Sequence, residues 1–347
     1  MLQLVETPFQ AIQGNRLSFH NINDPEAQEL DRGFLITKNP LMESLTYSIN
    51  VASQCDLTVL ITGETGTGKR LVGETIHKRS SRSDMPLVII NCASLSNELI
   101  DSELFGHKKG SFSSAYEDRV GLFEAGNGST VVIDEINALS LEYQAKLLRV
   151  LEERKIRRLG LNGEKNLNIR VIAITNQDLV RMVKKESFRK DLYYRINVLK
   201  IDVPPLRARK DDILKLVAYY IRMCRPGYYQ DVTISKDVAN TLMSHNWRGN
   251  IRELKNAIES ALADRSINHI DSIDLSDMED QENECDNDSE DNSKLCTLEE
   301  VQKKHILRVL KVCNGNVSSA ARILGLERSS ISRRLKEYGV DFHDYKA

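Results

Sequence analysis

Short apolar runs alternate with helix-like patterns between residues 34 and 205. Four of these runs are rich in β-branched residues and lack polar alternation: Leu57–Thr62, Leu87–Asn91, Val131–Asp134 and Ile169–Thr175. Such runs are typical of strands that are buried on both faces. Because helices connect parallel strands, the alternation predicts an α/β core over residues 34–205, with a parallel sheet and helices on both faces.

A helical segment follows the Pro204-Pro205 pair. Apolar residues recur at helical spacing in three stretches, near 210–224, 235–245 and 250–265. Ser235 is a candidate N-cap for the second stretch. We therefore predict an all-α lid over residues 206–275. Residues 1–33 show no clear periodicity, and we expect a short N-terminal arm there.

Charge divides the C-terminal part of the chain into two segments. Nine acids occur between Asp277 and Asp291, with only Met278 and Cys285 apolar among them. Such a segment cannot bury enough surface to fold, so we predict a flexible acidic linker over residues 276–296. An acidic decoy that competes with DNA for a basic patch is the alternative. Residues 297–347 carry ten Lys and Arg against six Asp and Glu.

Two short apolar faces lie within this basic segment. The first comprises Ala320, Ala321 and Leu324, and Gly325 and Leu326 break it. Ile331 and Leu335 begin the second face. Two short helices with a tight turn between them predict an all-α helix-turn-helix domain over residues 297–347. Ser329 and Ser330 are candidate caps of the second helix.

The second predicted helix carries polar residues away from its buried stripe. They are Arg328, Ser329, Ser330, Ser332, Arg333, Arg334 and Lys336. An Arg side chain can donate hydrogen bonds to guanine edges or to phosphate oxygens, and a Ser hydroxyl can bond to either. We expect Ser329, Ser330 and Arg333 to face bases, with Arg334 and Lys336 on phosphates. A solvated basic helix in a small bundle is the alternative.

Length and composition limit the classes of protein to which the chain can belong. The 347 residues allow two or three domains with a sizeable core. No apolar run approaches the ~18 residues that a membrane span requires, and the N-terminus lacks the pattern of a secretory signal. The six cysteines include no CxxC pair. We therefore expect reduced thiols, a cytoplasmic location and no membrane partner.

The string GETGTGKR carries the clearest chemistry in the chain. It follows the first apolar run and precedes a helical pattern, the setting of a phosphate-binding loop for ATP or GTP. Its glycines let the backbone point N–H groups inward, and Lys69 can reach the β- and γ-phosphates. The candidate nucleotide-binding residues are Gly63, Glu64, Thr65, Gly66, Thr67, Gly68, Lys69 and Arg70.

A second strand run ends in two acids, Asp134 and Glu135. A P-loop enzyme uses one carboxylate at such a position to hold Mg²⁺ and a second to orient the attacking water. Asp134 suits the metal and Glu135 the water. Arg70 stands where a simple P-loop has Ser or Thr, so contact with Mg²⁺ rests on Asp134, on Thr67 or on waters.

Several longer strings give the chain a specific resemblance. They are GETGTGKR, NCASLSNELIDSELFGH, LFEAGNGSTVVIDEI, AITN, FRKDLYYRIN, VPPLRAR and WRGNIRELKN. The chain resembles the bacterial enhancer-binding proteins, AAA+ ATPases that activate RNA polymerase carrying the sigma-54 factor. The resemblance covers about residues 34–275 and the C-terminal 50, where the segment is similar to the Fis-type DNA-binding domain of that family.

The resemblance implies roles for five further residues. Asn91 matches the residue that couples nucleotide state to Glu135, and Asn176 the sensor of the γ-phosphate. Arg189 and Arg195 match arginines offered to the ATP of a neighbouring subunit, and Arg252 matches a second sensor on the lid. Taken singly, Arg189 or Arg195 also suits a surface ion pair. Arginines supplied in trans imply a ring, so the family resemblance predicts a homo-oligomer that assembles from dimer to hexamer.

The family contacts sigma-54 through a loop that reads GAFTGA. The matching residues are Gly110, Ser111, Phe112, Ser113, Ser114 and Ala115. Phe112 keeps an apolar tip, whereas Ser114 replaces a glycine and restricts the backbone at a cost of about 1 kcal/mol if positive φ is required. Two interpretations remain open. Either the variant loop still engages sigma-54, or it does not. In the second case the ATPase ring acts on another target, or the protein regulates by DNA binding alone.

The resemblance implies an activator that binds enhancer DNA as a dimer and remodels the sigma-54 RNA polymerase holoenzyme with ATP and Mg²⁺. A generic P-loop enzyme acting on a small molecule is disfavoured, because no second substrate motif is present. No receiver domain is recognisable before residue 34. We therefore expect control by a regulatory partner protein, a small ligand or expression level.

Overall fold

The computed structural model describes most of the chain, with gaps. The described residues are 9–11, 16–19, 39–94, 100–111, 116–161, 163–226, 228, 232–264, 268–273, 275, 302, 305–306, 309–310, 316–326 and 328–337. The predicted linker 276–296 lies outside them. Contacts divide the chain into two compact units, residues 1–275 and 276–347.

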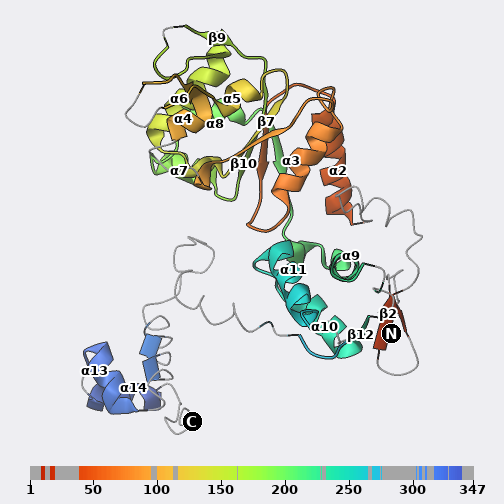
Figure 1. Cartoon of the computed structure of the whole chain (residues 1–347). Coiled ribbons are helices and arrows are strands. Elements are labelled where there is room, and N and C mark those ends of the chain that lie inside the picture. The colour runs from red at the N-terminus through yellow and green to blue at the C-terminus, as the bar shows by residue number, and fades with distance from the viewer. Residues whose placement is uncertain are drawn as a thin grey trace. The chain divides into compact units, whose positions relative to one another are not determined.

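A parallel sheet forms the centre of the α/β core in the first unit (Figure 1). Its strand order is β11-β3-β10-β7-β4. The strands are β3 (Val59–Thr62), β4 (Val88–Asn91), β7 (Thr130–Asp134), β10 (Arg170–Thr175) and β11 (Leu199–Asp202). All four predicted strands are present. The fifth, β11, escaped prediction because charged residues alternate along this edge strand.

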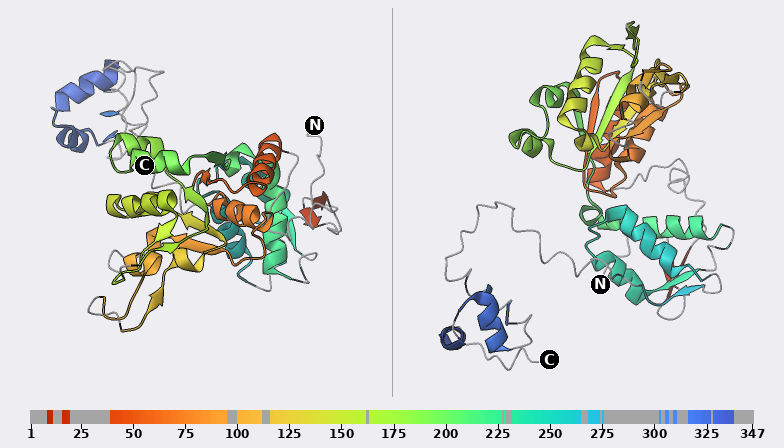
Figure 2. Two further views of the ribbon diagram at one scale, coloured as in Figure 1. Left: turned by 90° about the horizontal axis from the view of Figure 1, so that it is seen from above. Right: turned by 60° about the vertical axis from the view of Figure 1, so that its left-hand side comes forward.

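Alternate residues of the strands pack into two separate cores. Val131 and Val171 pack with helices on one face of the sheet, whereas Val132 and Ile172 pack on the opposite face. The first face is covered by α4 (Ile100–Phe105), α5 (Leu122–Ala125), α6 (Leu141–Glu153), α7 (Leu179–Lys184) and α8 (Lys190–Ile196). The other is covered by α2 (Pro40–Ser53) and α3 (Lys69–Lys78), as Figure 2 shows from two sides. The predicted α/β fold with helices on both faces is confirmed.

Two small hairpins extend from this core. They are β5 (Gly106–His107) with β6 (Arg119–Val120), and β8 (Lys155–Ile156) with β9 (Lys165–Asn166). The backbone N–H of Lys108 donates to Leu159 O at 3.0 Å, and Leu159 N donates to Gly106 O at 3.0 Å. The segment that leads to Gly110 is therefore bonded to the loop that connects β8 and β9.

Among the described residues of the lid, three helices occur, near the three stretches predicted to be helical. They are α9 (Ile213–Cys224), α10 (Lys236–Ser244) and α11 (Asn250–Ala261). The Ser235 side chain accepts from Val238 N at 3.1 Å and caps α10, which confirms the predicted start. Trp247 and Leu254 are buried at the centre of the lid core.

A small sheet completes the lid and was not predicted. Strands β1 (Phe9–Ala11) and β2 (Arg16–Phe19) come from the N-terminal arm, and β12 (Thr233–Ser235) and β13 (His269–Ile270) from the lid. Leu17 lies opposite Ile234 in the pairing of β2 with β12 and packs against the lid core. Strands of two to four residues are too short to show a period in the sequence.

The second unit contains the predicted helix-turn-helix. Its helices are α13 (Val317–Leu324) and α14 (Arg328–Glu337), and Gly325 ends the first with φ +64°. Ala320, Ile331 and Leu335 are buried with Ile306 and Leu310 of the preceding segment. Since α14 begins at Arg328, Ser329 and Ser330 lie in its first turn and are not its N-cap. No helix in the described part of the chain has the length and apolarity needed to span a membrane.

Candidate nucleotide site

The GETGTGKR string forms a tight loop between β3 and α3. Gly63, Gly66 and Gly68 have φ values of +148°, +78° and +95°. A Cβ on Gly66 would lie 2.2 Å from the carbonyl oxygen of Gly249, so no side chain fits there. Gly68 precedes the first residue of α3, and no side chain caps this helix. Its first N–H groups are therefore available to an anion such as phosphate.

Lys69 lies within this loop. Its ammonium donates to the Glu64 carbonyl oxygen at 2.8 Å, and only 8% of the residue is exposed. Burial holds the pKa of Lys69 below its usual value, while the carboxylates of Glu135 and Asp134 oppose that effect. The cation is thus held at the loop by a bond to a neutral carbonyl, which a phosphate oxygen can replace.

The two predicted acids stand at the carboxyl end of β7. Glu135 N donates to Asp134 Oδ1 at 3.0 Å, and Glu135 adopts left-handed backbone with φ +54°. Asn91 lies opposite Asp134 in the pairing of β4 with β7, and its Oδ1 accepts from Ala93 N at 3.0 Å. The three residues therefore end neighbouring strands at one edge of the sheet.

Asn176 follows β10 and reaches the P-loop directly. Its Nδ2 donates to Thr65 Oγ1 at 3.1 Å. Its Oδ1 is buried and has no hydrogen-bond partner within the described residues. A buried acceptor left unsatisfied costs free energy, so this atom favours a ligand or water as a partner. The uncapped helix and the held ammonium fit the phosphates of a nucleoside triphosphate, whereas the Asn176 oxygen requires a donor such as a water molecule.

Thr67 and Arg70, the two positions of the string that bear on contact with Mg²⁺, differ in exposure. Thr67 is buried and donates to the Glu64 carbonyl oxygen at 2.9 Å. Arg70 is exposed and pairs with Glu74 at 3.1 Å. The described residues contain no cluster of three His, Cys, Asp or Glu that would form a metal site by itself. Mg²⁺ in a P-loop needs one or two protein ligands besides phosphates and water, and Asp134 fits that role.

The three predicted arginines lie in two places. Arg252 stands in the first turn of α11, and its Cβ lies 3.2 Å from the Cβ position of Gly66. Arg189 and Arg195 are exposed at α8. Arg189 pairs with Asp191 at 2.7 Å, and Arg195 donates to Leu151 O at 2.8 Å. Within one chain, Arg252 therefore borders the P-loop, while Arg189 and Arg195 contact residues of α8 and α6.

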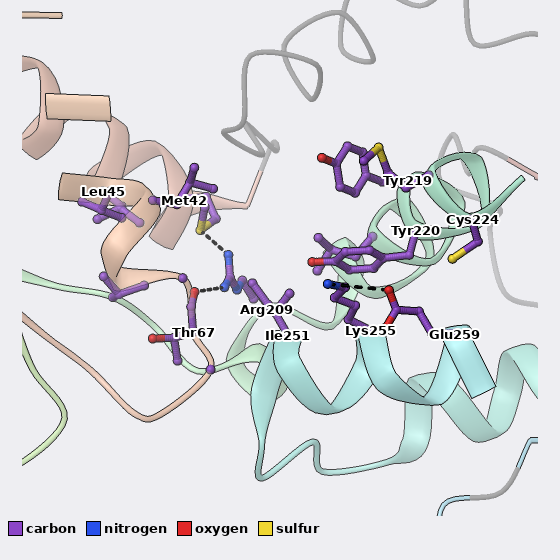
Figure 3. Close-up of a pocket in the computed structure, with 17 residues that line it drawn as sticks. Met42, Leu45, Thr67, Arg209, Tyr219, Tyr220, Cys224, Ile251, Lys255 and Glu259 are labelled. Atoms are coloured by element: carbon purple, nitrogen blue, oxygen red, sulfur yellow. Dashed lines mark hydrogen bonds and ion pairs between the residues drawn. The ribbon is translucent and has the colours of Figure 1, made fainter. Parts of the chain in front are cut away.

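A cavity of about 510 Å³ adjoins the P-loop and was missed by the sequence analysis (Figure 3). Residues of α2, α9 and α11 form most of its wall, among them Met42, Tyr220 and Ile251. Lys255 and Glu259 pair at 3.6 Å on its lid side. These residues follow ordinary helical core spacing, so no motif distinguishes them. The volume and apolar lining suit a planar organic group such as a nucleobase.

The structure describes part of the two other predicted surfaces. Gly110 is exposed with φ +79°, and Ser111 packs against Gly160, whereas 112–115 lie outside the described residues. On α14, Arg328, Ser329 and Arg333 are exposed, and Ser330 and Arg334 are half-buried. The side chains of Ser332 and Lys336 lie outside the described part of the chain.

Three family descriptions match consecutive parts of the chain. Residues 35–202 match the sigma-54 interaction domain, and residues 207–292 match the AAA+ ATPase lid domain. Residues 297–338 match the Fis family of bacterial regulatory proteins.

The chain is also similar over most of its length to characterised proteins. It is 39% identical to the DNA-binding transcriptional activator HyfR of Escherichia coli, over 94% of this chain and 50% of HyfR. It is 36% identical to the transcriptional regulatory protein GlrR of Escherichia coli, over 93% of this chain and 72% of GlrR. The crystal structure of NtrX from Brucella abortus in complex with ADP aligns with a TM-score of 0.64 at 29% identity, over 91% of this chain and 74% of NtrX.

Proposed function

Because this chain belongs to the family of sigma-54-dependent transcriptional regulators, with an AAA+ domain and a Fis-type DNA-binding domain, we propose that it is an ATP-driven activator of sigma-54 RNA polymerase. The chain spans half the length of HyfR. The observation that carries the proposal is the meeting of Lys69, Asn176 and the strand-end acids at one uncapped helix terminus.

In this proposal the P-loop binds and hydrolyses ATP. Backbone N–H groups of α3 and the Lys69 ammonium bind the β- and γ-phosphates. Mg²⁺, held by Asp134, would neutralise charge that develops on the phosphate oxygens. Glu135 orients the attacking water, and Asn176 and Arg252 sense the γ-phosphate. Asn91, on the neighbouring strand, couples the nucleotide state to Glu135.

Hydrolysis also requires a neighbouring subunit. Arg189 and Arg195 are exposed on α8 and would enter the site of the next protomer in a ring. An arginine on the γ-phosphate accelerates phosphoryl transfer by about 10³–10⁵. The exchange of Asp191 for a phosphate as the partner of Arg189 is the step that assembly would produce.

The Fis-type domain would hold the ring at an enhancer as a dimer. The exposed Arg328, Ser329 and Arg333 of α14 suit the major groove. Two-fold symmetry predicts half-sites about one DNA turn apart.

Open-complex formation tests the proposal. Purified sigma-54 polymerase, supercoiled enhancer DNA and the full chain should give open complexes with ATP and none with a non-hydrolysable analogue. Measurable ATP hydrolysis without open complexes would contradict activation of sigma-54.

The alternative is a DNA-binding regulator whose ring does not engage sigma-54. The Gly110–Ala115 string supports it, because Ser114 replaces a glycine of GAFTGA. Replacing the string by GAFTGA in the same assay separates the two. Activity that appears only in this variant would favour the alternative for the natural chain.

A further inference from the structure

Consecutive residues of the P-loop are bonded to the lid and to the segment that enters it. Asn250 Nδ2 donates to Glu64 Oε2 at 3.2 Å and to Thr65 O at 3.0 Å. The backbone N–H of Ile251 donates to Gly66 O at 3.0 Å. Arg209 Nη2 donates to Thr67 O at 3.2 Å (Figure 3). The backbone of the loop that would bind the phosphates is therefore held in place by hydrogen bonds from the lid and its entry segment.

Asn250 is the centre of this support. It is fully buried, with 0% of its surface exposed, and its backbone is left-handed with φ +56°. Its Oδ1 accepts from Leu206 N at 2.8 Å, in the segment that joins core to lid. A non-glycine residue keeps this conformation only where its surroundings over-determine it. One carboxamide thus joins the P-loop, the entry to the lid and the start of α11.

Glu64 receives a second partner from the same entry segment. Both guanidinium nitrogens of Arg207 bond to its carboxylate, one of them at 2.7 Å. Arg207 and Asn250 lower the pKa of Glu64 through these hydrogen bonds, with the Arg207 bond the larger cause and burial opposing them. A charged pair at 44% and 42% side-chain exposure contributes little to stability alone. Its geometry nevertheless directs the Glu64 carboxylate toward the lid.

We propose that Asn250, with Arg207, is a positioning residue for nucleotide binding, which ties the P-loop backbone to the orientation of the lid through Glu64 and Thr65. This inference rests on the proposed ATP site. A lid that rotates away breaks the Asn250 bonds and releases the loop; a nucleotide that orders the loop restores them. By linkage, lid docking and nucleotide affinity must strengthen each other by the same factor.

A pair of substitutions at the Asn250–Glu64 contact tests the tie. Asn250→Asp keeps an acceptor for Leu206 N but sets a carboxylate against Glu64 and the Thr65 carbonyl. We expect its Kd for a fluorescent ATP analogue to rise by tenfold or more, as for one lost charge-assisted hydrogen bond. Adding Glu64→Gln supplies a donor to the new carboxylate and should restore the Kd to within about threefold of the wild type.

Amide hydrogen exchange in the nucleotide-free full chain gives an independent readout. Peptides that cover residues 63–68 should exchange faster in Asn250→Asp and at the wild-type rate in the double variant. Glu153→Gln, which breaks an exposed pair with Arg149 on α6, is the matched control and should change neither measurement.

The outcomes distinguish the positioning role of Asn250 from the ATP site on which it rests. Unchanged exchange and Kd in Asn250→Asp, or no recovery in the double variant, would overturn the positioning role. Altered exchange in a chain whose wild type binds no nucleotide would keep the tie and reject the ATP site. If Asn250→Asp does not fold, Arg207→Glu, which sets two carboxylates together at the exposed pair, tests the same tie. We expect a higher Kd and faster exchange over residues 63–68, and wild-type values of both would overturn the positioning role.

Discussion

At the scale of residues, burial and neighbouring charge set the chemistry of groups around the site. Cys92 follows Asn91 at the end of β4 and is 5% exposed. Burial, reinforced by the charges of Asp134 and Glu135, raises the pKa of its thiol to about 12. For Lys69 of the P-loop, burial lowers the pKa, and the same two carboxylates oppose that effect. Burial beside these carboxylates therefore suppresses the thiolate form of Cys92.

Cys92 should therefore be inert in the folded protein. We expect no alkylation of Cys92 by iodoacetamide at pH 8 over the time in which it reacts fully in urea, since the thiolate is the reactive form. Peptide mass spectrometry measures the modification residue by residue. Rapid native-state labelling at Cys92 would contradict the burial described here.

Glu124 lies under the second hairpin and links pH to stability. Arg158 binds it through two bonds of 2.6 Å, and Lys165 through one of 2.7 Å. Because of the Arg158 hydrogen bond above all, the pKa of Glu124 falls from 4.5 to about 2. Because the pKa of Glu124 is lower in the folded than in the unfolded chain, the ionised carboxylate stabilises the fold at pH values above the unfolded-state pKa. That stabilisation is lost as the pH falls from about 4.5 toward about 2.

The Glu124→Gln variant should lack this contribution. At pH 7 we expect its free energy of unfolding to be lower by at most about 3 kcal/mol, the equivalent of the pKa difference. The difference in unfolding free energy between the variant and the wild type should become smaller as the pH falls from 4.5 to 2. Urea unfolding at several pH values measures both curves, and parallel curves would argue against an ion pair at Glu124.

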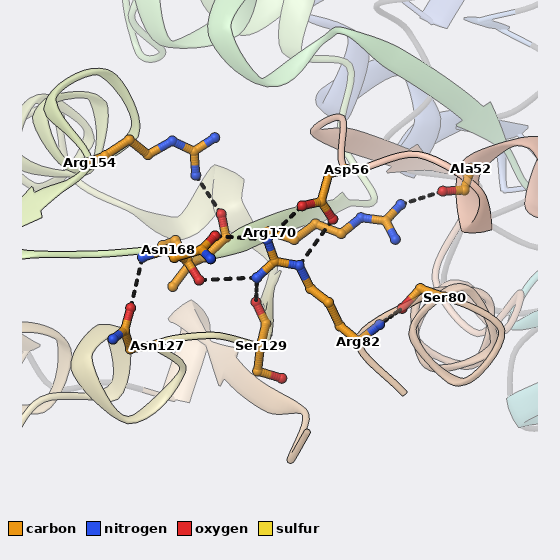
Figure 4. Close-up of polar contacts among 10 residues, drawn as sticks. Ala52, Asp56, Ser80, Arg82, Asn127, Ser129, Arg154, Asn168 and Arg170 are labelled. Atoms are coloured by element: carbon orange, nitrogen blue, oxygen red, sulfur yellow. Dashed lines mark hydrogen bonds and ion pairs between the residues drawn. The ribbon is translucent and has the colours of Figure 1, made fainter. Parts of the chain in front are cut away.

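At the scale of elements, the amino ends of the strands are held by arginines (Figure 4). Arg170 begins β10, is 1% exposed and donates to Ala52 O. Nε and Nη2 of Arg82 donate to Asp56 at 3.0 and 2.6 Å, and its Nη1 donates to the Ser129 and Asn168 carbonyl oxygens at 3.2 and 3.1 Å. These bonds join the segments before β3, β7 and β10 opposite the P-loop edge.

Arg82→Lys should separate charge from geometry at this end of the sheet. A lysine keeps the cation but cannot satisfy a carboxylate and two carbonyls together. We expect a loss of about 2 kcal/mol in unfolding free energy, within the range for hydrogen bonds to charged groups. Chemical denaturation measures it, with Arg149→Lys at an exposed position of α6 as a control that should leave stability unchanged.

Secondary-structure elements could be predicted from the sequence where burial leaves a clear hydrophobic pattern. Central strands such as Val131–Asp134 read as apolar runs because both of their faces are covered. The edge strand β11, with exposed Lys200 and Asp202, does not. The cavity wall and Asn250 were missed for another reason: their roles come from contacts between core and lid, which the chain makes only after folding. The P-loop was found because its chemistry is local in sequence.

At the scale of the whole molecule, the proposed activity belongs to a ring. A Lys69→Ala chain would lack nucleotide binding but keep Arg189, and an Arg189→Ala chain would keep the P-loop but lack the finger. Each should hydrolyse ATP at least tenfold more slowly than wild type. An equal mixture should recover activity at about a quarter of its interfaces by random assembly. A mixture as inactive as its components would exclude completion of the site in trans.

The most direct test of the central claim is open-complex formation by Glu135→Gln, which is designed to bind ATP without hydrolysing it. With sigma-54 polymerase and supercoiled enhancer DNA, we expect wild-type nucleotide affinity, hydrolysis reduced at least 100-fold by loss of the group that orients water, and no open complexes. Open complexes formed by Glu135→Gln at the wild-type rate would contradict an activator driven by ATP hydrolysis.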